Sequence, residues 1–329
     1  MNAIVELSTR EQIDAIIPTT DDALLALLPA RERLQPAVLP VGSEQAYRSA
    51  SDKAFLQSIA PRFGIAVPRQ VLLDARRAIG ADEIRFPVVV KPSVSVNANF
   101  TRNFAVRHAA TNRELETILA EAPAESYPLL VQEKIVGPGI GVFLLSWGGE
   151  QVAAFSHRRL REKPPGGGVS VYAESIALDE ELVARSRQLL SDIGFEGVAM
   201  VEYKLDCVTG VPYLLEVNGR FWGSLQLAID AGVDFPQLLI SVAVDGVVPP
   251  RPNPIPGVRT RWWWGDVDHL IARFRRSPAE LGLTTDAPTR GRALRDFLRS
   301  GGPLDRNQIL RMDDLRPAWR ETLDWIARR

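Results

Sequence analysis

Glu202, Glu216, Asn218 and Arg220 are the residues whose types and spacing point most directly to chemistry. Two carboxylates that face each other across paired strands repel, unless a cation lies between them or one carboxyl is protonated. Asn218 adds a neutral oxygen ligand, and Arg220 follows where the strand ends. Such oxygens suit Mg²⁺, and arginine suits phosphate. The four side chains therefore predict a clamp for Mg²⁺ and phosphate.

A β-hairpin within residues 197–220 would bring these side chains together. The sequence alternates apolar and polar residues over 198–206 and again over 213–218. Between them, residues 208–210 predict a three-residue loop with Gly210 in the left-handed conformation. Pairing centred on residue 209 would place Glu202 opposite Glu216, on the same face of the hairpin.

This pattern resembles the ATP-grasp superfamily, in which an acid or amide on one strand is followed by Glu-x-Asn-x-Arg on the next. The resemblance covers roughly residues 45–245 and is closest to the carboxylate–amine ligase branch, whose members often carry a stretch like residues 157–168. It implies an α+β ATP-grasp fold in which two α+β subdomains hold ATP. It also implies two Mg²⁺ ions, replaceable by Mn²⁺, with Glu202, Glu216 and Asn218 as ligands.

Two lysines are the candidates for phosphate binding. Residues 86–92 predict a buried strand that ends near Lys91, and a lysine is costly to bury there without an anionic partner. The resemblance implies that Lys91 contacts phosphate and adenine, and that Lys53 is the earlier family lysine at the start of a helix. The alternative for Lys53 is an ordinary surface lysine.

The same resemblance implies a flap and a hinge. The flap over the phosphates corresponds to residues 93–103, with Ser93 and Ser95 as small residues but no glycine. Glu133, Lys134 and Ile135 correspond to the hinge that holds adenine. Ile140 stands where the family often has an acid for the ribose hydroxyls, which predicts weaker ribose contacts or contacts from elsewhere.

The basic segment 157–163 leads into Gly166-Gly167-Gly168 and predicts a mobile loop. Arginine can clamp an acyl phosphate or a carboxylate in two-pronged fashion, and a closing loop would exclude water. Arg159 and His157 are therefore catalytic candidates beside Arg220. The alternative is a solvated loop with unremarkable charges.

Composition excludes several classes of protein. The 329 residues contain 39 Lys and Arg and 40 Asp and Glu, which argues against nucleic-acid binding. Neither a signal-peptide layout nor an apolar run of the roughly 18 residues needed to cross a membrane is present in the sequence. A lone Cys207 suits a reducing cytoplasm, so we expect a cytoplasmic protein without membrane partners.

The expected organisation has three parts. Residues 1–48 predict a strand, a helix and a strand, with Asp21 or Asp22 capping the helix, and form a partial α/β pre-ATP-grasp segment. Residues 49–246 form the ATP-grasp core, with a small subdomain at about 92–136, and residues 247–329 a Pro-rich linker and helical extension. The short front indicates a missing first part, an unusual start site or a partner that supplies it; a homodimer is the other option.

Three adjacent tryptophans, Trp262, Trp263 and Trp264, cannot all face one core. They predict either an aromatic seam where the tail packs or a wall facing substrate or another subunit.

The function expected from the resemblance is an ATP-dependent carboxylate–amine ligase that works through an acyl phosphate. Its substrates would be a small carboxylate and an amine. One alternative keeps the site and changes the acceptor from an amine to another nucleophile. The other is a nucleotide-binding module that is non-catalytic or acts only with a partner.

Overall fold

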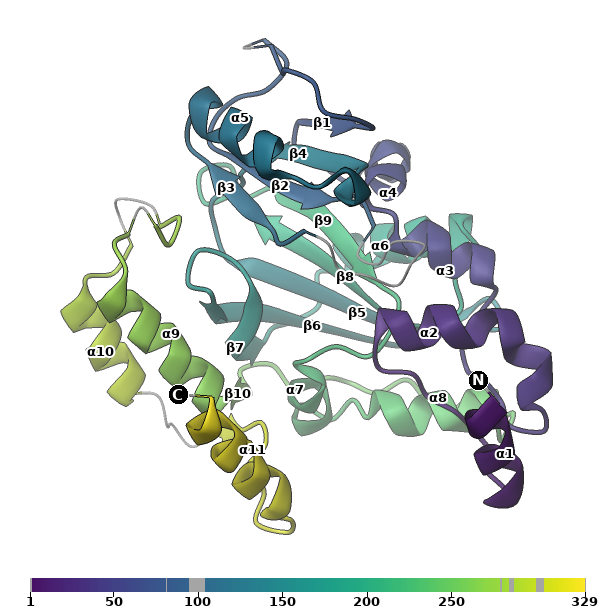
Figure 1. Ribbon diagram of the computed structural model, residues 1–329. Coiled ribbons are helices and arrows are strands. Elements are labelled where there is room, and N and C mark those ends of the chain that lie inside the picture. Colours follow the sequence, from purple (N-terminus) through teal and green to yellow (C-terminus); the bar gives the residue numbers. More distant parts are fainter. Residues whose placement is uncertain are drawn as a thin grey trace. The chain divides into compact units, whose positions relative to one another are not determined.

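The computed structural model describes residues 2–80, 82–94, 104–278, 280–283, 287–299 and 305–328 (Figure 1). The chain divides into two compact units. Unit 1 comprises Met1–Ala154, Asp179–Trp222 and Phe235–Arg251, and unit 2 comprises Phe155–Leu178, Gly223–Asp234 and Pro252–Arg329. The combination of helices with antiparallel sheets confirms the expected α+β class.

The first part of unit 1 is helical. Its elements are α1 (Asn2–Arg10), α2 (Asp21–Leu27), η1 (Leu28–Leu34), α3 (Glu44–Ser51), α4 (Lys53–Ile59) and η2 (Ala60–Phe63). The strands expected before and after α2 are reduced to a single parallel bridge between Ala15 and Val38. The expected cap of α2 was also wrong, because Thr20 accepts the hydrogen bond from Ala23 N and leaves Asp21 available for other partners.

A four-stranded antiparallel sheet follows in unit 1, in the order β1-β4-β2-β3. Its strands are β1 (Gln70–Leu73), β2 (Val88–Pro92), β3 (Arg107–Ala109) and β4 (Leu129–Glu133). Helix α5 (Asn112–Glu121) lies over it and buries Leu115, Ile118 and Leu119 in the same core (Figure 1). Thr111 caps α5, and the short 3-10 helix η3 (Ala124–Ser126) leads into β4.

The second sheet region of unit 1 contains β5 (Gly139–Trp147), β8 (Gly197–Leu205) and β9 (Pro212–Asn218), all antiparallel. Helices α3 and α4 pack against β9, while α6 (Glu180–Asp192) and α8 (Phe235–Ala243) pack against β5. Asp179 caps α6. The side chain of Trp222 lies between Phe143 and Phe235, with ring centroids 4.3 and 5.1 Å away.

The β8–β9 hairpin pairs Glu202 with Glu216, as expected, but by a different route. Asp206 N donates to Val211 O, so the loop has four residues rather than three. The register then shifts between Glu202 and Tyr203, because Leu215 is an extra residue that forms a bulge on β9. The two one-residue offsets cancel, and Gly210 adopts the expected left-handed conformation (φ +69°).

Strand β6 (Glu150–Lys163) begins in unit 1, and from Phe155 onward it belongs to unit 2. Its other elements are β7 (Val169–Ser175), α7 (Leu225–Asp230), β10 (Arg259–Arg261), α9 (Trp263–Arg275), α10 (Arg290–Arg299), β11 (Asp305–Asn307) and α11 (Arg316–Ala327). Strand β7 pairs antiparallel with β6 and β10, and β10 pairs in parallel with β11.

The three tryptophans at the start of α9 contact the tail helices. Trp262 Nε1 donates to Glu321, and Trp264 stacks on Trp325 with centroids 4.1 Å apart. The ring of Trp263 lies 5.6 Å from that of Phe297 on α10. The tryptophans therefore form a seam between α9 and the helices that follow it, all within unit 2.

Candidate nucleotide-binding site

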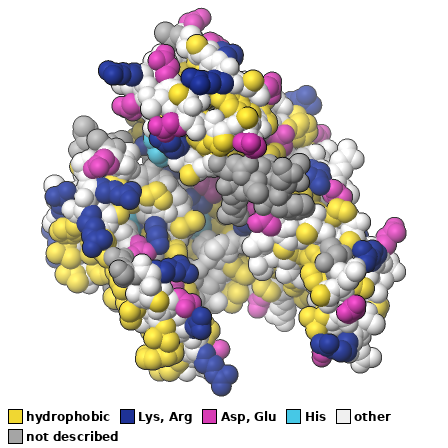
Figure 2. Space-filling model, in the orientation of Figure 1, with side chains coloured by type: hydrophobic (Ala, Val, Ile, Leu, Met, Phe, Trp, Pro, Cys, Tyr) yellow, Lys and Arg dark blue, Asp and Glu magenta, His cyan; other side chains and the backbone are white. Residues whose placement is uncertain are grey.

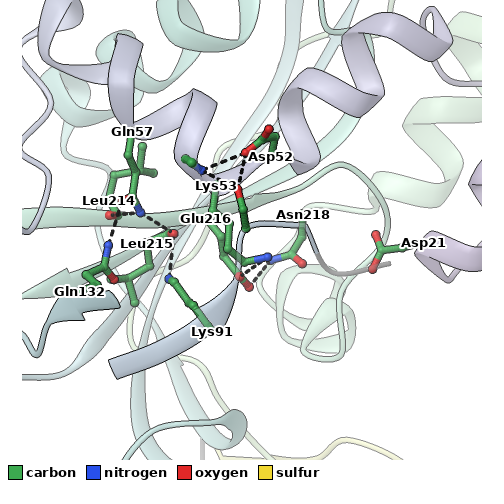
Figure 3. A network of polar contacts seen from close by, with 12 residues as sticks. Asp21, Asp52, Lys53, Gln57, Lys91, Gln132, Leu214, Leu215, Glu216 and Asn218 are labelled. Carbon is green, nitrogen blue, oxygen red and sulfur yellow. Dashed lines mark hydrogen bonds and ion pairs between the residues drawn. The ribbon is translucent and has the colours of Figure 1, made fainter. Parts of the chain in front are cut away.

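Glu202, Glu216 and Asn218 lie together at the open end of the β8–β9 hairpin in unit 1. Asn218 Nδ2 donates to Glu216 Oε1 at 3.2 Å, which leaves the amide oxygen directed elsewhere. Lys53 Nζ lies 3.5 Å from Glu216 Oε2 (Figure 3). A cation from the protein thus offsets part of the repulsion between the facing carboxylates.

Lys53 and Lys91 are both buried to the same degree, each 7% exposed. Lys53 opens α4, and Lys91 lies near the end of β2, where its Nζ donates to Leu215 O at 3.3 Å. Burial lowers the pKa of Lys91 to about 8, an effect that Lys53 adds to and that Glu216 and Glu202 oppose. The positive charges of the two lysines repel each other, and a nearby anion would relieve this repulsion. The pair therefore favours a negatively charged ligand.

The bulge at Leu215 has a direct consequence for the site. Because Leu215 has no partner opposite it on β8, its carbonyl accepts from both Lys91 Nζ and Gln57 Nε2, the latter at 2.9 Å. Gln132 Nε2 in turn donates to Gln57 Oε1 at 2.8 Å, and both glutamines are buried. This network links α4, β4 and β9 beside the lysines (Figure 3).

Asp52 joins the helix that carries Lys53 to the strand that carries Lys91. Its Oδ1 accepts from the backbone N–H groups of Ala54 and Phe55 and so caps α4. The same oxygen accepts from Ser93 Oγ at 2.6 Å, and Lys53 N donates to Ser93 O at 2.9 Å. Ser93, which the family resemblance assigns to the flap, is therefore fixed at the start of α4. Ser95 lies outside the described residues.

Arg220 is held from the N-terminal part of unit 1. Its Nη2 donates to Asp21 Oδ2 at 3.2 Å and to Asn218 Oδ1 at 3.3 Å. Asp21 also accepts from the buried Tyr47 hydroxyl at 2.7 Å. Arg220 Nε is buried and has no hydrogen-bond acceptor among the described residues. A guanidinium so placed has a donor to spare for an anion.

The three hinge residues lie together at the end of β4. Glu133 Oε1 accepts from Arg85 N at 3.1 Å, and Lys134 N donates to Pro87 O at 2.9 Å. Burial lowers the pKa of Lys134, and nearby Lys204 lowers it further. Glu133 thus fixes the loop that precedes β2. The adenine-binding roles of Glu133, Lys134 and Ile135 remain predictions. Ile140, at the expected ribose position, is a buried residue of β5 opposite Tyr203.

His157 and Arg159 belong to unit 2 and lie on β6, not in a mobile loop. His157 is fully buried, and burial, with Arg159 nearby, lowers its pKa well below the ordinary value. The side chain is therefore neutral, and its catalytic role remains a prediction. Ser224 Oγ lies 3.3 Å from His157 Nδ1. Arg159 Nη1 donates to Glu162 at 3.2 Å and to Gly168 O at 3.0 Å.

Gly166 and Gly168 of the glycine run pack closely against neighbouring backbone. A Cβ at Gly166 would lie 1.8 Å from Leu281 O, and one at Gly168 would lie 2.2 Å from Lys163 O. Glycine is needed there because backbone approaches backbone in the β6–β7 turn.

The donor set in unit 1 fits Mg²⁺ in chemistry, with two facing carboxylates and an amide oxygen. No group of three or more His, Cys, Asp and Glu side chains within the described residues could hold a metal ion, so a metal here would depend on ligand phosphates as well. Asp52, Gln57 and Gln132 had no predicted role, and Asp21 was predicted only as a possible helix cap. Only Asp52 carried a usable signal, an aspartate directly before a helix.

No helix in the described residues has both the length and the apolar character to cross a membrane.

Comparison with solved structures identifies the fold as ATP-grasp. An L-amino acid ligase from Bacillus licheniformis superposes with a TM-score of 0.59 at 21% identity, over 76% of this chain and 62% of that one. A biotin carboxylase from Campylobacter jejuni in a β,γ-ATP complex gives 0.59 at 20% identity, over 76% and 58%. An N5-carboxyaminoimidazole synthetase from Staphylococcus aureus complexed with ADP gives 0.58 at 13%, over 76% and 66%.

The sequence also carries a family match. Residues 125–265 match the model described as "ATP-grasp in the biosynthetic pathway with Ter operon". The expected ATP-grasp resemblance is therefore confirmed. A comparison with curated proteins gave no significant match. The chain spans about three fifths of the length of the ligase and the carboxylase.

Proposed function

We propose that this protein is an ATP-dependent carboxylate–amine ligase that uses Mg-ATP and an acyl-phosphate intermediate. The observation that carries the proposal is the direct pairing of Glu202 with Glu216, with Lys53 held at 3.5 Å from Glu216. The protein retains two facing carboxylates, whose mutual repulsion a bound metal would relieve. The ATP-grasp fold, found also in an L-amino acid ligase, supports the reaction class.

The chain's own residues would act by binding and positioning. Lys53 and Lys91 would bind phosphate oxygens, and Arg220 would stabilise the phosphoryl group during transfer. Glu202, Glu216 and Asn218 would hold Mg²⁺, which when bound would screen the charge of the phosphates. Glu133, Lys134 and Ile135 would hold adenine.

The chemistry needs no nucleophilic side chain. A substrate carboxylate oxygen would attack the γ-phosphorus, forming the C–O–P linkage as the bond to the ADP oxygen breaks. An amine nitrogen would then attack the acyl carbon. The C–N bond forms, phosphate leaves with the C–O bond electrons, and the amine loses a proton.

The first experiment is thermal melting of the purified chain with ATP, with and without Mg²⁺. A ligand that binds only the folded state raises the midpoint. A Mg²⁺-dependent rise supports the site, and no shift at millimolar ATP contradicts it. Carboxylates and amines would then be screened for ADP release, and a panel of other nucleophiles would distinguish the alternative acceptors.

Glu216→Gln is the matched variant for this test. It keeps the shape of the side chain and removes the charge, so we expect loss of the Mg²⁺-dependent shift and of turnover. Without ligand, the free energy of unfolding should change by no more than about 1 kcal/mol, the contribution of a weak ion pair. Glu150→Gln, at an exposed position on β6, serves as the control. Full turnover in Glu216→Gln would refute the metal assignment.

A further inference from the structure

The oxygen atoms predicted to bind a metal have N–H groups of the protein against them. Glu216 Oε1 accepts from Asn218 Nδ2 at 3.2 Å, and Glu216 Oε2 lies 3.5 Å from Lys53 Nζ (Figure 3). Asn218 Oδ1 accepts from Arg220 Nη2 at 3.3 Å. An ammonium this close to Glu216 repels a metal ion bound to the same carboxylate. Lys53 and a metal therefore compete for Glu216.

The burial of Lys53 makes this competition strong. Figure 2 shows many Lys and Arg side chains at the surface, where water and salt screen their charges. The side chain of Lys53 differs, because it is only 8% exposed, and that of Glu216 is 28% exposed. Charges that are shielded from water interact more strongly than charges at the surface. The charge of Lys53 should thus weaken the binding of a metal to Glu216 markedly.

The ammonium group of Lys53 can change its partner while its backbone stays in place. Lys53 N donates to Ser93 O at 2.9 Å, and Asp52 caps the helix that Lys53 opens. The ammonium lies at the end of a flexible four-carbon chain. Lys91 differs, because its Nζ donates to the uncharged carbonyl of Leu215. Of the two lysines, Lys53 is thus the one paired directly with a predicted metal ligand.

We propose that Lys53 exchanges partners when the nucleotide binds: it pairs with Glu216 in the protein alone and transfers to phosphate in the complex with ATP. The inference rests on the proposed function, in which ATP and Mg²⁺ both bind at this site. Transfer of Lys53 to phosphate makes Glu216 available to the metal. Because the coupling between two ligands is reciprocal, each then favours the binding of the other. The site therefore takes up Mg-ATP in preference to free Mg²⁺.

The test measures the two ligands separately on the full chain. Binding of Mn²⁺ without nucleotide is followed by the electron paramagnetic resonance of the free ion, and binding of ATP by calorimetry in EDTA. Lys53→Met removes the charge and keeps the length of the side chain. We expect Mn²⁺ to bind about tenfold more tightly to this variant, because the competing cation is gone. ATP should bind about tenfold more weakly, because a charge-assisted hydrogen bond is lost.

Three further variants serve as controls. Lys163→Met removes a lysine that pairs with Asp268 in unit 2, and should change neither affinity. Lys53→Arg keeps the charge and should keep the weak binding of Mn²⁺. The double variant Lys53→Met/Glu216→Gln should lose the gain in Mn²⁺ affinity, which assigns the metal to Glu216. Thermal melting checks that each variant is folded, and Lys53→Gln replaces Lys53→Met if the latter is not.

Opposite changes in the two affinities distinguish the exchange from simpler roles of Lys53. A purely structural role would weaken the binding of both ligands, and a role in phosphate binding alone would leave the Mn²⁺ affinity unchanged. Either result in a folded variant would overturn the exchange, even if the original protein binds Mg-ATP. Conversely, the proposed function fails if the original protein gives no Mg²⁺-dependent response to ATP, whatever the Mn²⁺ titrations show.

Discussion

At the scale of single residues, Asp21 connects the N-terminal part of unit 1 to the candidate catalytic arginine. Its carboxylate holds Arg220 Nη2 at 3.2 Å, while Tyr47 fixes the same carboxylate from the other side at 2.7 Å. Without this partner, Arg220 would retain only its contacts with Asn218 and the Phe221 carbonyl among those described. Asp21 is therefore a positioning residue for Arg220.

We expect Asp21→Asn to reduce kcat by roughly 10- to 100-fold with a smaller change in KM for ATP, because a misplaced arginine costs transition-state stabilisation more than ground-state binding. ADP-release kinetics with the identified substrates give both constants. The neighbouring Asp22→Asn is the matched control and should retain activity. An unchanged kcat in Asp21→Asn would show that Arg220 is placed without Asp21.

Lys91 should make nucleotide binding dependent on pH. Burial depresses its pKa to about 8 from the usual 10.5, so the charged form prevails in the folded protein only below that pH. Phosphate stabilises the charged form, and above pH 8 binding must take up a proton. We expect the affinity for ATP to be level below pH 8 and to fall by up to about tenfold per pH unit above it.

Titration calorimetry in buffers of different ionisation enthalpy measures both the affinity and the proton uptake. Lys91→Arg is the matched variant, because arginine stays charged throughout this range and should remove the pH dependence. An equal slope in Lys91→Arg would assign the titrating group elsewhere. The stability of the fold changes in the opposite direction from the affinity for ATP. It rises between about pH 8 and 10.5, because the cost of burying a charged lysine disappears over that range.

The sequence was informative wherever a residue acts through its local pattern. Glu202 and Glu216 were placed opposite each other by strand alternation and a turn glycine, both short-range signals. Asp21, Gln57 and Gln132 were not found, because their partners lie 26 to 199 positions away and polar side chains give no periodic signal at such distances. The burial of His157 was not predicted, because it depends on the packing of β6 and not on sequence neighbours.

At the scale of elements, Asp52 both caps α4 and connects the start of α4 to the segment after β2. Asp52 Oδ1 accepts two backbone hydrogen bonds of α4 and the hydroxyl of Ser93. We expect Asp52→Ala to lower the free energy of unfolding by about 1–2 kcal/mol, as for other lost caps, and to weaken ATP binding as well.

The control for Asp52→Ala is another cap lost at a distance from the site. Thr111 caps α5 by accepting from Glu114 N at 3.3 Å. Thr111→Ala should cost similar stability without changing the ATP-dependent shift in melting temperature. If both variants lose the shift equally, the effect of Asp52→Ala is general destabilisation and not the loss of its contact with Ser93.

Elements with end signals were predicted well, and elements without them were not. Thr111, Asp179 and Gly64 mark helix ends in the sequence, and α5, α6 and the helical turn before Gly64 follow those marks. The strand expected near residues 13–17 failed because an apolar run alone does not specify a pairing partner, and only Ala15 forms a bridge. The bulge at Leu215 leaves no trace in the pattern, because the longer turn compensates for it.

At the scale of the whole molecule, the charges are distributed unequally along a nearly neutral chain. Residues 259–329 contain 15 arginines, no lysine and 10 acids, a local excess of five positive charges in a chain of net charge −1. Several of these arginines form ion pairs inside unit 2; Arg261, for example, binds the buried Asp266 at 2.6 Å, and Arg311 binds Asp230 at 2.6 Å. Part of the local positive charge therefore serves the internal structure of unit 2.

The candidate nucleotide site is built from unit 1 alone, which gives a test at the level of the molecule. Its two lysines, the Glu202–Glu216 pair, Asn218, Arg220 and the hinge all fall within the segments of that unit. Amide hydrogen exchange should therefore slow in these segments when Mg-ATP binds, because a ligand suppresses the local opening through which buried amides exchange. We expect the protection to be concentrated in residues 52–56, 88–94, 129–136 and 200–220.

The same exchange experiment on Glu216→Gln separates ligand protection from general stabilisation. If Glu216 holds the metal, the variant should lose the Mg²⁺-dependent part of the protection in these segments and keep its unliganded exchange pattern elsewhere. The segments 290–299 and 316–327 of α10 and α11 provide an internal reference, since none of the proposed ATP ligands lies in them. Protection by Mg-ATP that was confined to unit 2 would place the nucleotide outside the lysine–carboxylate site and would contradict the assignment of Lys53, Lys91 and Glu216 together.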